Sequence, residues 1–366
     1  MMKKHGLLLL TALSAVTFLA GCGSQDTTAE IAVVTDVGSL KDGGFNEGTW
    51  NGAKEYADAN GKTVNYYQPN GGGNATDADR VDAMNLAIEN GAKVIVAPGY
   101  LQQAAMETVA KANPEVKFVF VDGWNFGLSN VTAISYKEEE AGYMAGYAAY
   151  MEGYRKLGGT FGGGGTNPAC NRFAYGYVQG INAAALASNG DEATVKMSFK
   201  YGSSFGASSD LQQQMSGWYQ GGTQVIFSCG GSMVNSVISA AAAYPDAKII
   251  GVDTDQSGLS DKIITSAMKG LVPSVKKILG EYYAGEWDTK LADKTSKLGA
   301  ADDATGLPTG SSWRFQHYTE AQYNTLFNNI KNGQVIILDT IVEADKALTW
   351  GVIDAALTKI TINFEA

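Results

Sequence analysis

The sequence predicts an α/β protein with two doubly wound lobes, each built on a parallel sheet, and a ligand cleft between the lobes. From residue 30 onward, short runs rich in β-branched and aromatic residues alternate with stretches whose apolar residues recur at helical spacing. Such alternation is typical of βαβ units in a parallel sheet. The pattern runs twice along the chain, and 366 residues are enough for two domains.

The first series of elements covers residues 30–137. Its second helix places Ala83, Met84 and Ile88 on one face and ends at Gly91, as helices commonly do. The expected strands are 31–35, 63–67, 93–97, 117–122 and 131–135, and the expected helices are 45–60, 76–90 and 101–113.

The second series begins with a helix at residues 138–152. It repeats the pattern of glycine and proline positions in the first series. Gly91 and Gly221 each end a helix before a strand, and Pro114 and Pro245 each come shortly before the strand that follows the next helix. This weak internal duplication favours two lobes of similar architecture. The further strands expected here are 157–161, 193–199, 224–228 and 248–252, and the further helices are 171–186, 208–220 and 232–243.

The elements after residue 252 are too few for a third domain. We expect strands at 263–267 and 334–338 and helices at 273–283 and 320–331. They would complete the two lobes, so the chain would cross between lobes more than once and the cleft would close by hinge motion. The first lobe is then 30–137 plus roughly 254–290, the second is 138–253 plus roughly 310–345, and residues 346–366 form a loosely amphipathic tail.

Residues 1–29 are expected to be a lipoprotein signal peptide and tether. Two lysines precede an apolar run that is too short for a comfortable membrane span and that ends in Leu-Ala-Gly-Cys, which resembles a lipobox. Cys22 would then carry the lipid. The alternative is an ordinary secretion signal with an incidental cysteine. The lipid would anchor the protein to the extracytoplasmic face of the cell membrane.

Composition argues against several functions. A net charge of −10 without a basic patch makes nucleic acid a poor partner. Beyond the leader His317 is the sole histidine and no Cys-x-x-Cys spacing occurs, so neither a metal nor a cofactor is expected. Cys170 and Cys229 could form a disulfide outside the cytoplasm or remain free thiols, because the sequence does not give their separation.

Carboxylates follow several of the expected strands. Asp36, Asp122 and Asp253 each come directly after an apolar run, where the crevice of an open α/β sheet lies. They could accept hydrogen bonds from ligand hydroxyl and amine groups, or they could cap helices and initiate turns. Their equivalent positions favour a binding role for at least two of them. Lys269, at another strand end, could donate to a sugar hydroxyl, pair with Asp253 or be solvated.

Two phenylalanines lie in polar, glycine-rich loops that offer little core to join. Phe45 lies beside the loop of Asp36, and Phe205 lies in the loop after strand 193–199. Each could present a flat face to a ring, or could pack on its own helix. Tyr100 and Trp124 are weaker candidates on the same grounds.

The sequence lacks the familiar hydrolase motifs. Residues 162–165 are four glycines without the Gly-Lys-Ser/Thr ending of a phosphate loop, and they predict a flexible connection that could line the cleft. There is no Gly-x-Ser-x-Gly elbow, and His317 has no recognisable catalytic partner. Paired carboxylates for glycoside hydrolysis remain open, because their spacing is spatial.

Several longer motifs occur in a fixed order. Residues 36–46 are Asp-Val-Gly-Ser-Leu-Lys-Asp-Gly-Gly-Phe-Asn, and Trp-Asn-Gly follows at 50–52. Residues 139–149 are Glu-Glu-Ala-Gly-Tyr-Met-Ala-Gly-Tyr-Ala-Ala. Residues 251–257 are Gly-Val-Asp-Thr-Asp-Gln-Ser, and Thr-Ser-Ala-Met-Lys ends at Lys269. Over about residues 30–283 the chain therefore resembles the basic membrane protein (Bmp) family of substrate-binding lipoproteins.

The resemblance implies a type I periplasmic-binding-protein fold and service as the receptor of an ABC importer. Characterised members, of the purine nucleoside receptor kind, bind nucleosides. Carried over by position, Phe45 and Phe205 would sandwich the base, with Asn46 in the same ligand-binding set. Asp36 and Asp122 would bond the edges of the base.

The resemblance also implies how the sugar is held. Asp253 and Lys269 would bind the ribose hydroxyls, and Gly230 or Gly231 would offer backbone groups. The chain departs from the family at Gly44, where a small polar residue is usual, in residues 291–317 and in the glycine run. Some relatives bind other flat rings, including a flavin, so these departures bear on ligand selectivity.

We therefore expect a lipid-anchored, extracytoplasmic substrate-binding protein that binds a nucleoside of the purine kind and docks on ABC permease subunits in the membrane. It would not be an enzyme, and its membrane contact would be the lipid anchor alone. The alternatives are a binder of another ring ligand such as a flavin or a sugar, a ligand sensor, or a surface hydrolase.

Overall fold

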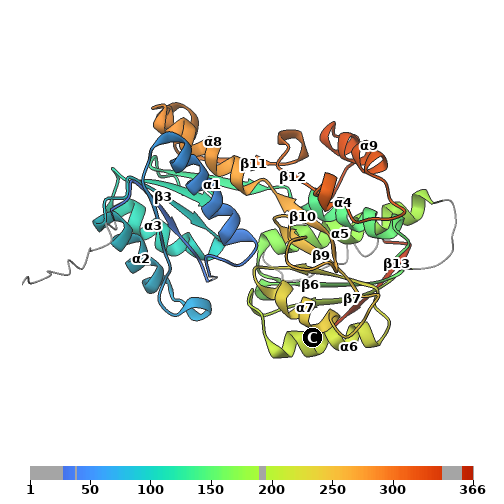
Figure 1. Cartoon of the computed structure of the whole chain (residues 1–366). Coiled ribbons are helices and arrows are strands. Elements are labelled where there is room, and N and C mark those ends of the chain that lie inside the picture. Colours follow the sequence, from blue (N-terminus) through green and yellow to red (C-terminus); the bar gives the residue numbers. More distant parts are fainter. Residues whose placement is uncertain (1–27, 38, 189–194, 340–356, 366) are drawn as a thin grey trace, which may run out of the picture.

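A computed structural model describes residues 28–37, 39–188, 195–339 and 357–365. The described chain forms two lobes, each with a mainly parallel sheet covered by helices on both faces (Figure 1). The first sheet has six strands in the order β11-β5-β4-β3-β1-β2, and the second has seven in the order β12-β10-β9-β8-β6-β7-β13. The predicted α/β fold is confirmed. The predicted lipobox, with Cys22, lies outside the described residues.

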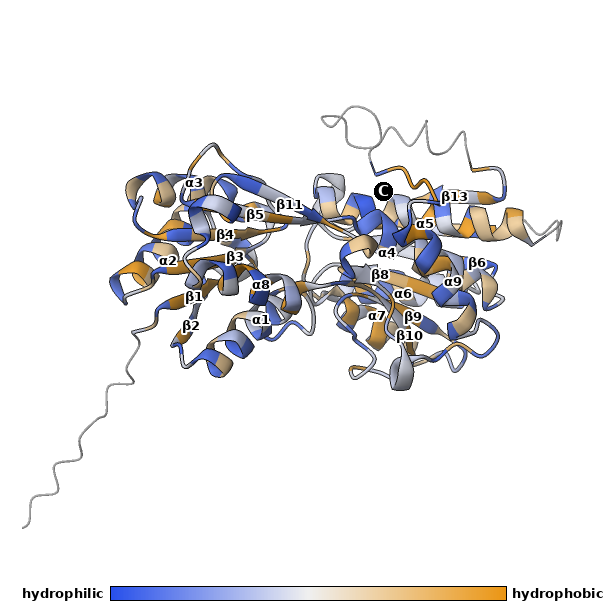
Figure 2. Ribbon diagram, turned by 90° about the horizontal axis from the view of Figure 1, so that it is seen from above, coloured by the Kyte–Doolittle hydropathy of each residue, from blue (hydrophilic) through white to orange (hydrophobic). Residues whose placement is uncertain are grey.

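The first lobe is built from the described chain up to Tyr136 and a later return that supplies α8 and β11. Its strands are all parallel, and the central ones, β1, β3, β4 and β5, are buried and largely apolar because helices cover both faces of the sheet. Their apolar colour can be followed in Figure 2. One face is covered by α1 and α8, and the other by α2 and α3. The elements are β1 Ile31–Val34, α1 Phe45–Asn60, β2 Val64–Tyr67, α2 Asp77–Glu89, β3 Val94–Pro98, α3 Gln103–Ala112, β4 Lys117–Val121, β5 Val131–Tyr136, α8 Leu271–Tyr283 and β11 Lys294–Leu298.

The second lobe repeats this design. One face of its sheet packs against α4, α5 and α9, and the other against α6 and α7. The elements are α4 Glu138–Met151, β6 Lys156–Phe161, α5 Pro168–Ala187, β7 Val195–Tyr201, α6 Ser209–Gln220, β8 Val225–Cys229, α7 Met233–Ala241, β9 Lys248–Asp253, β10 Ile263–Lys269, β12 Thr305–Gly306, α9 Glu320–Lys331 and β13 Ile360–Phe364.

The chain crosses between the lobes at Lys137, at Gly270 and again after Leu298. These crossings lie side by side, because the backbone N–H of Lys137 donates to the carbonyl of Leu298 and that of Gly270 donates to the carbonyl of Ala304, each at 2.8 Å. The crossings are candidates for the hinge that the sequence could not locate.

Three expected assignments differ in the structure. Residues 254–269 were expected in the first lobe, but β10 pairs with β9, in register from Thr265 opposite Ile250, so this part belongs to the second sheet. Residues 334–338 form no strand; Val335 and Ile337 pack on the second core instead, and Ile336 and Leu338 are exposed. Residues 346–366 were expected to form a tail outside the two lobes, yet β13 pairs with β7 at the edge of the second sheet.

Helices α4 and α5 cross unusually closely. A Cβ at Gly176 would lie 2.0 Å from the carbonyl oxygen of Glu139, and one at Gly146 would lie 2.1 Å from that of Tyr177. Small residues at spacings of four let two helix backbones approach in this way. The crossing brings the first turns of both helices to the space between the lobes. No helix among the described residues is long and apolar enough to cross a membrane.

Candidate ligand-binding site

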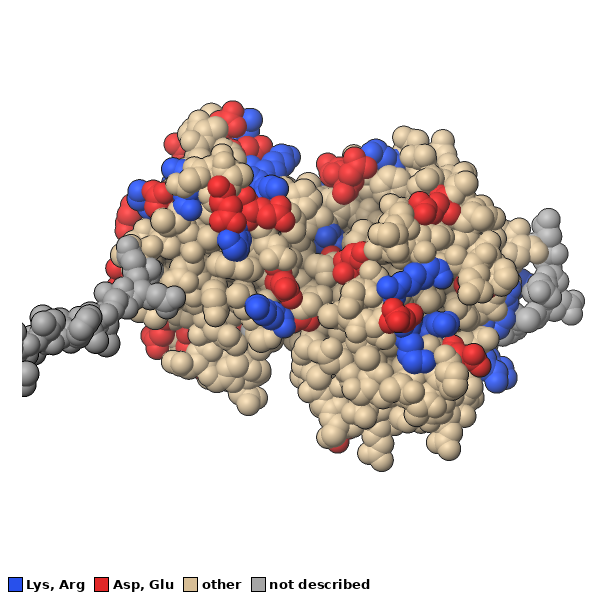
Figure 3. Space-filling view, viewed as in Figure 1, with Lys and Arg blue, Asp and Glu red and all other residues tan. Residues whose placement is uncertain are grey.

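A cavity of about 710 Å³ lies between the lobes, at the carboxyl ends of strands from both sheets. This is where open α/β sheets bind ligands, and the volume is in the usual range for small-molecule sites. All of the predicted ligand-binding residues line it: Asp36, Phe45, Asn46, Asp122, Phe205, Gly230, Gly231, Asp253 and Lys269. Figure 3 shows the narrow waist where the two lobes meet.

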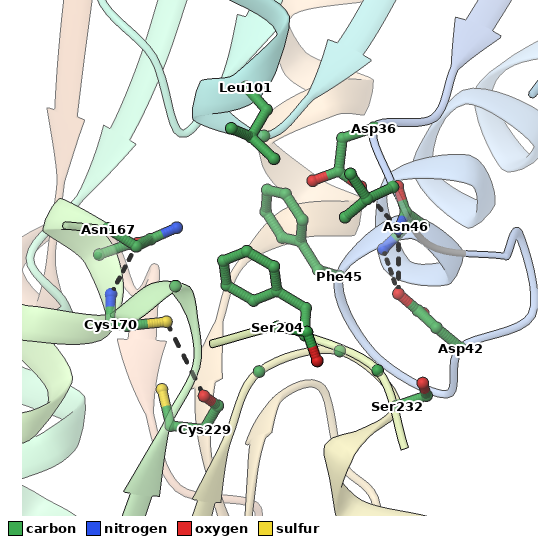
Figure 4. Close-up of a pocket in the computed structure, with 18 of the residues that line it drawn as sticks. Asp36, Asp42, Phe45, Asn46, Leu101, Asn167, Cys170, Ser204, Cys229 and Ser232 are labelled. Atoms are coloured by element: carbon green, nitrogen blue, oxygen red, sulfur yellow. Dashed lines mark hydrogen bonds between the residues drawn. The ribbon is translucent and has the colours of Figure 1, made fainter. Parts of the chain in front are cut away.

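The first lobe contributes a polar corner at the start of α1. Asp42 accepts hydrogen bonds from the backbone N–H groups of Gly44 (2.8 Å), Asn46 (3.1 Å) and Glu47 (3.2 Å), and so caps the helix. The Asn46 amide then donates to Asp42 at 3.1 Å and to Asp36 at 3.2 Å (Figure 4). The Asn46 Oδ1 atom is buried with no hydrogen-bond partner among the described residues. It is an acceptor that a ligand donor could satisfy.

Backbone shape fixes the Asp36 carboxylate in this corner. Gly99, at the end of β3, has φ of 98°, and a Cβ there would lie 2.3 Å from Asp36 Oδ2. Glycine is therefore required at residue 99 for the carboxylate to lie against the backbone. Burial raises the pKa of Asp42, against the backbone N–H groups that lower it.

Asp122 and Asp253 occupy equivalent positions in the two lobes. Asp122 directly follows β4 and Asp253 is the last residue of β9, and both adopt left-handed backbone conformations, with φ of 59° and 67°. Aspartate tolerates this region better than most residues, but it still costs on the order of 1 kcal/mol, and such strain clusters at functional sites. Neither residue is the N-cap of a helix in the described ranges, and both carboxylates line the cavity.

Lys269 is the cation at the centre of the site. Its side chain is 2% exposed, and it pairs with Asp122 from the first lobe, with Glu138 at 3.3 Å and with Asp253 at 3.5 Å. The solvated alternative is therefore wrong, and the pairing with Asp253 is confirmed. Burial alone would lower the pKa of Lys269, but these carboxylates raise it well above its usual value. Its Nζ also lies 4.9 Å from the centre of the Phe45 ring.

One ammonium group cannot neutralise all the carboxylates around it. Burial raises the pKa of Asp253 to about 7, although Lys269 acts in the opposite direction. Burial also raises the pKa of Asp122, again against Lys269. A carboxyl group in this state can exchange its proton for a hydrogen bond from a ligand hydroxyl near neutral pH.

The sequence analysis missed Glu138 and Arg172. The Arg172 Nε donates to Glu138 at 2.5 Å and lies 3.9 Å from Glu139. Burial disfavours the charged form of Glu138, but Arg172 and Lys269 more than offset it and lower its pKa. The charge of Glu139 is offset less by nearby cations, and burial raises the pKa of Glu139 to about 7. The sequence feature that could have indicated Glu138 is the run of three glutamates that begins α4. The motif at residues 139–149 includes only the last two of them.

Glu140, the third glutamate, fixes the last crossing between the lobes. Its Oε2 accepts from the backbone N–H of Ala300 at 2.6 Å and from the Thr305 hydroxyl at 2.9 Å. The first turn of α4 thus connects the buried ions under the cavity with the backbone of the hinge.

The aromatic candidates divide by position. Phe45 lines the cavity from the first lobe, Phe205 lines it from the second, and Tyr100 is also in the lining. Trp124 is not in the lining; it is partly exposed and contacts Phe120. A cavity with phenylalanine rings from opposite lobes can hold a flat ligand by stacking.

Cys170 and Cys229 also line the cavity, as buried free thiols. The Cys170 thiol donates to the carbonyl oxygen of Cys229 at 3.8 Å (Figure 4). Burial raises the pKa of Cys229 well above its usual value. Across the described ranges, no group of three or more His, Cys, Asp or Glu side chains is arranged to hold a metal ion.

Comparison with known proteins places this chain in a family. Residues 29–340 match the Bmp family, described as "ABC transporter substrate-binding protein PnrA-like". The ABC transporter nucleoside-binding protein BmpA of Lactococcus lactis is 29% identical, with 75% of this chain and 84% of that protein covered. Basic membrane protein D of Borreliella burgdorferi is 28% identical over 87% of this chain and 90% of its own.

Solved structures confirm the fold. An ABC transporter solute-binding protein from Aeropyrum pernix superposes with a TM-score of 0.72 at 21% identity, covering 89% of this chain and 96% of that one. The periplasmic-binding-protein-like fold predicted from the sequence is therefore confirmed. With most of its length matched in order and its cleft lined as the family motifs imply, this chain belongs to the Bmp family of PnrA-like ABC transporter substrate-binding proteins.

Proposed function

We propose that this protein binds a nucleoside, with a purine base preferred, in the cavity between its lobes and delivers it to an ABC permease. The observation that carries the proposal is the joint lining of one cavity by Phe45, Phe205, Asp253 and Lys269. Rings from opposite lobes suit a flat base, and a carboxylate beside an ammonium group suits vicinal hydroxyls. The name of the Lactococcus lactis relative, which states nucleoside binding, supports the same ligand class.

The residues divide into a base end and a sugar end. Phe45 and Phe205 would stack on the base, while the polar corner of Asp36 and Asn46 would bond its edge. Asp253 would accept from the ribose hydroxyls, and Lys269 would donate to them. Gly230 and Gly231 would contribute backbone groups. Asp122, which pairs with Lys269, would then orient the ammonium group as well as face the base.

A thermal-shift screen tests the ligand class. Protein without its signal peptide is heated with purine and pyrimidine nucleosides, free bases, sugars and flavins. A ligand at a hundred times its Kd stabilises the folded state by about 2.7 kcal/mol, which is easily measured. Purine nucleosides should give the largest shift. A shift with a sugar or flavin and none with any nucleoside would overturn the proposal.

We propose that the protein is held at the extracytoplasmic membrane face by a lipid on Cys22, with the remaining residues before β1 acting as a tether. Cells fed a labelled fatty acid should label the wild-type protein and not the Cys22→Ala variant, which should leave the membrane fraction. Equal labelling of both would refute the anchor.

A separate incubation tests for catalysis. Recovery of intact nucleoside after prolonged incubation with the protein would support binding without catalysis, and the appearance of free base or sugar would support the alternative of a surface hydrolase.

A further inference from the structure

We propose that a glycine platform positions the Phe205 ring and thereby makes the site specific for ligands with a planar ring. The platform consists of Gly162 and Gly163, which follow β6, and Gly230 and Gly231, which follow β8. This inference rests on the proposed function, because it assigns these backbones a part in nucleoside binding.

The glycines after β6 lie directly against the ring. A Cβ at Gly162 would be 2.6 Å from Cδ1 of Phe205, and one at Gly163 would be 3.0 Å from Cζ. The first distance is shorter than carbon atoms can approach. Gly162 has an ordinary φ of −70°, so its backbone conformation does not require glycine. The aromatic ring is the reason that a side chain cannot be accommodated there.

The glycines after β8 support the same residue from a second strand. A Cβ at Gly230 would be 3.2 Å from Cδ1 of Phe205, and one at Gly231 would be 2.9 Å from its carbonyl oxygen. The two halves of the platform are joined, because the Gly162 N–H donates to the carbonyl of Cys229 at 2.8 Å. The loop that carries Phe205 is also tied down, since Gly164 N–H donates to Gly202 at 2.8 Å.

This arrangement gives the glycine run at residues 162–165 a structural role that the sequence alone did not indicate. The run was predicted to be a flexible connection, but its first two residues are a surface on which a ring rests. Phe205, held against these glycines, lines the same cavity that Phe45 lines from the other lobe. A ring held in place before the ligand arrives loses little freedom on binding, so more of the stacking energy appears as affinity. A planar ring gains this advantage and a bare sugar does not.

A double-mutant cycle tests the platform. Nucleoside affinity is measured for the wild type, Gly162→Ala, Phe205→Ala and the double variant. Gly162→Ala should weaken binding up to about tenfold by displacing the ring. In the Phe205→Ala background the same change should weaken it less than about twofold, because no ring remains to be displaced. Gly217→Ala, within α6, is the matched control: its Cβ would meet nothing within 4 Å and its backbone is helical, so its effect should not depend on Phe205.

Equal weakening by Gly162→Ala in both backgrounds, or no weakening, would overturn the platform. If the wild type binds no nucleoside at all, the proposed function fails, and the platform is judged from thermal unfolding of the same four proteins. Gly162→Ala should then lower the Tm only when Phe205 is present. Equal lowering in both backgrounds would overturn the platform independently of any ligand.

Discussion

The titration of Asp253 should make nucleoside affinity depend on pH. Burial raises the pKa of its carboxyl to about 7, with Lys269 acting against that rise and Asp122, Asp42 and Glu138 reinforcing it. If the ribose hydroxyls donate to Asp253, the ionised form is the one that binds. About nine-tenths of the molecules carry that form at pH 8 and about a tenth at pH 6. Affinity should therefore fall about tenfold from pH 8 to pH 6, or about 1.4 kcal/mol.

Isothermal titration calorimetry between pH 5.5 and 8.5 measures this dependence. Binding at pH 6 should release close to one proton, so the observed heat should differ between buffers of different ionisation enthalpy. Asp253→Asn is the informative variant, because asparagine also tolerates the left-handed backbone and removes the charge alone. It should bind more weakly than the wild type at pH 8 and should lose the pH dependence.

A second group with a raised pKa provides the control. The pKa of Glu139 is also about 7, but Glu139 is not among the residues that line the cavity. Glu139→Gln should therefore keep the slope of affinity against pH. Affinity that stays constant between pH 6 and pH 8, or a slope that survives in Asp253→Asn and disappears in Glu139→Gln, would refute the assignment of Asp253 to the ligand.

The remaining predictions concern packing, charge and ligand selection. Gly176→Ala should lower the unfolding free energy by about 2 kcal/mol or more in denaturant titrations, because its Cβ would meet the Glu139 carbonyl. Gly217→Ala, whose Cβ would meet nothing within 4 Å, should cost no stability, and equal effects of the two changes would contradict the close crossing of α4 and α5. Lys269→Met should cost about 3–5 kcal/mol by leaving buried carboxylates uncompensated, and a variant as stable as the wild type would contradict the ion cluster. Since Lys269 is the one cation among the described lining residues, a nucleoside 5′-monophosphate should bind at least about a hundredfold more weakly than its nucleoside, and similar affinities would count against the acidic character of the cavity.

The sequence could predict those site residues whose placement follows from local rules. Asp36, Asp122 and Asp253 each follow a recognisable strand, and the carboxyl ends of parallel strands meet at one edge of a sheet. Phe45 and Phe205 lie in loops at those same edges. Their convergence on one cavity was expected from two lobes, which the repeated alternation of elements supported, and from the resemblance to the Bmp family, which alone implied that Phe45 and Phe205 act together.

Other features depend on contacts between distant parts of the chain. Glu138 and Arg172 meet because α4 and α5 cross at their glycines, and no local pattern gives that crossing. Lys269 is surrounded by carboxylates from both lobes, so its burial could not be inferred from its neighbours in sequence. The strand β13 joins the second sheet by pairing with β7, which lies far away along the chain. Long-range pairing of this kind leaves little trace in a short window of sequence.

Nucleoside binding in the cleft is tested most directly by calorimetric titration of the delipidated wild-type protein with a purine nucleoside at pH 8. One nucleoside should bind per chain, with a Kd of about 1 μM or tighter, and the Phe45→Ala variant should lose at least about tenfold in affinity. No saturable heat with any nucleoside at millimolar concentration, together with saturable binding of a sugar, would contradict nucleoside recognition by this cleft.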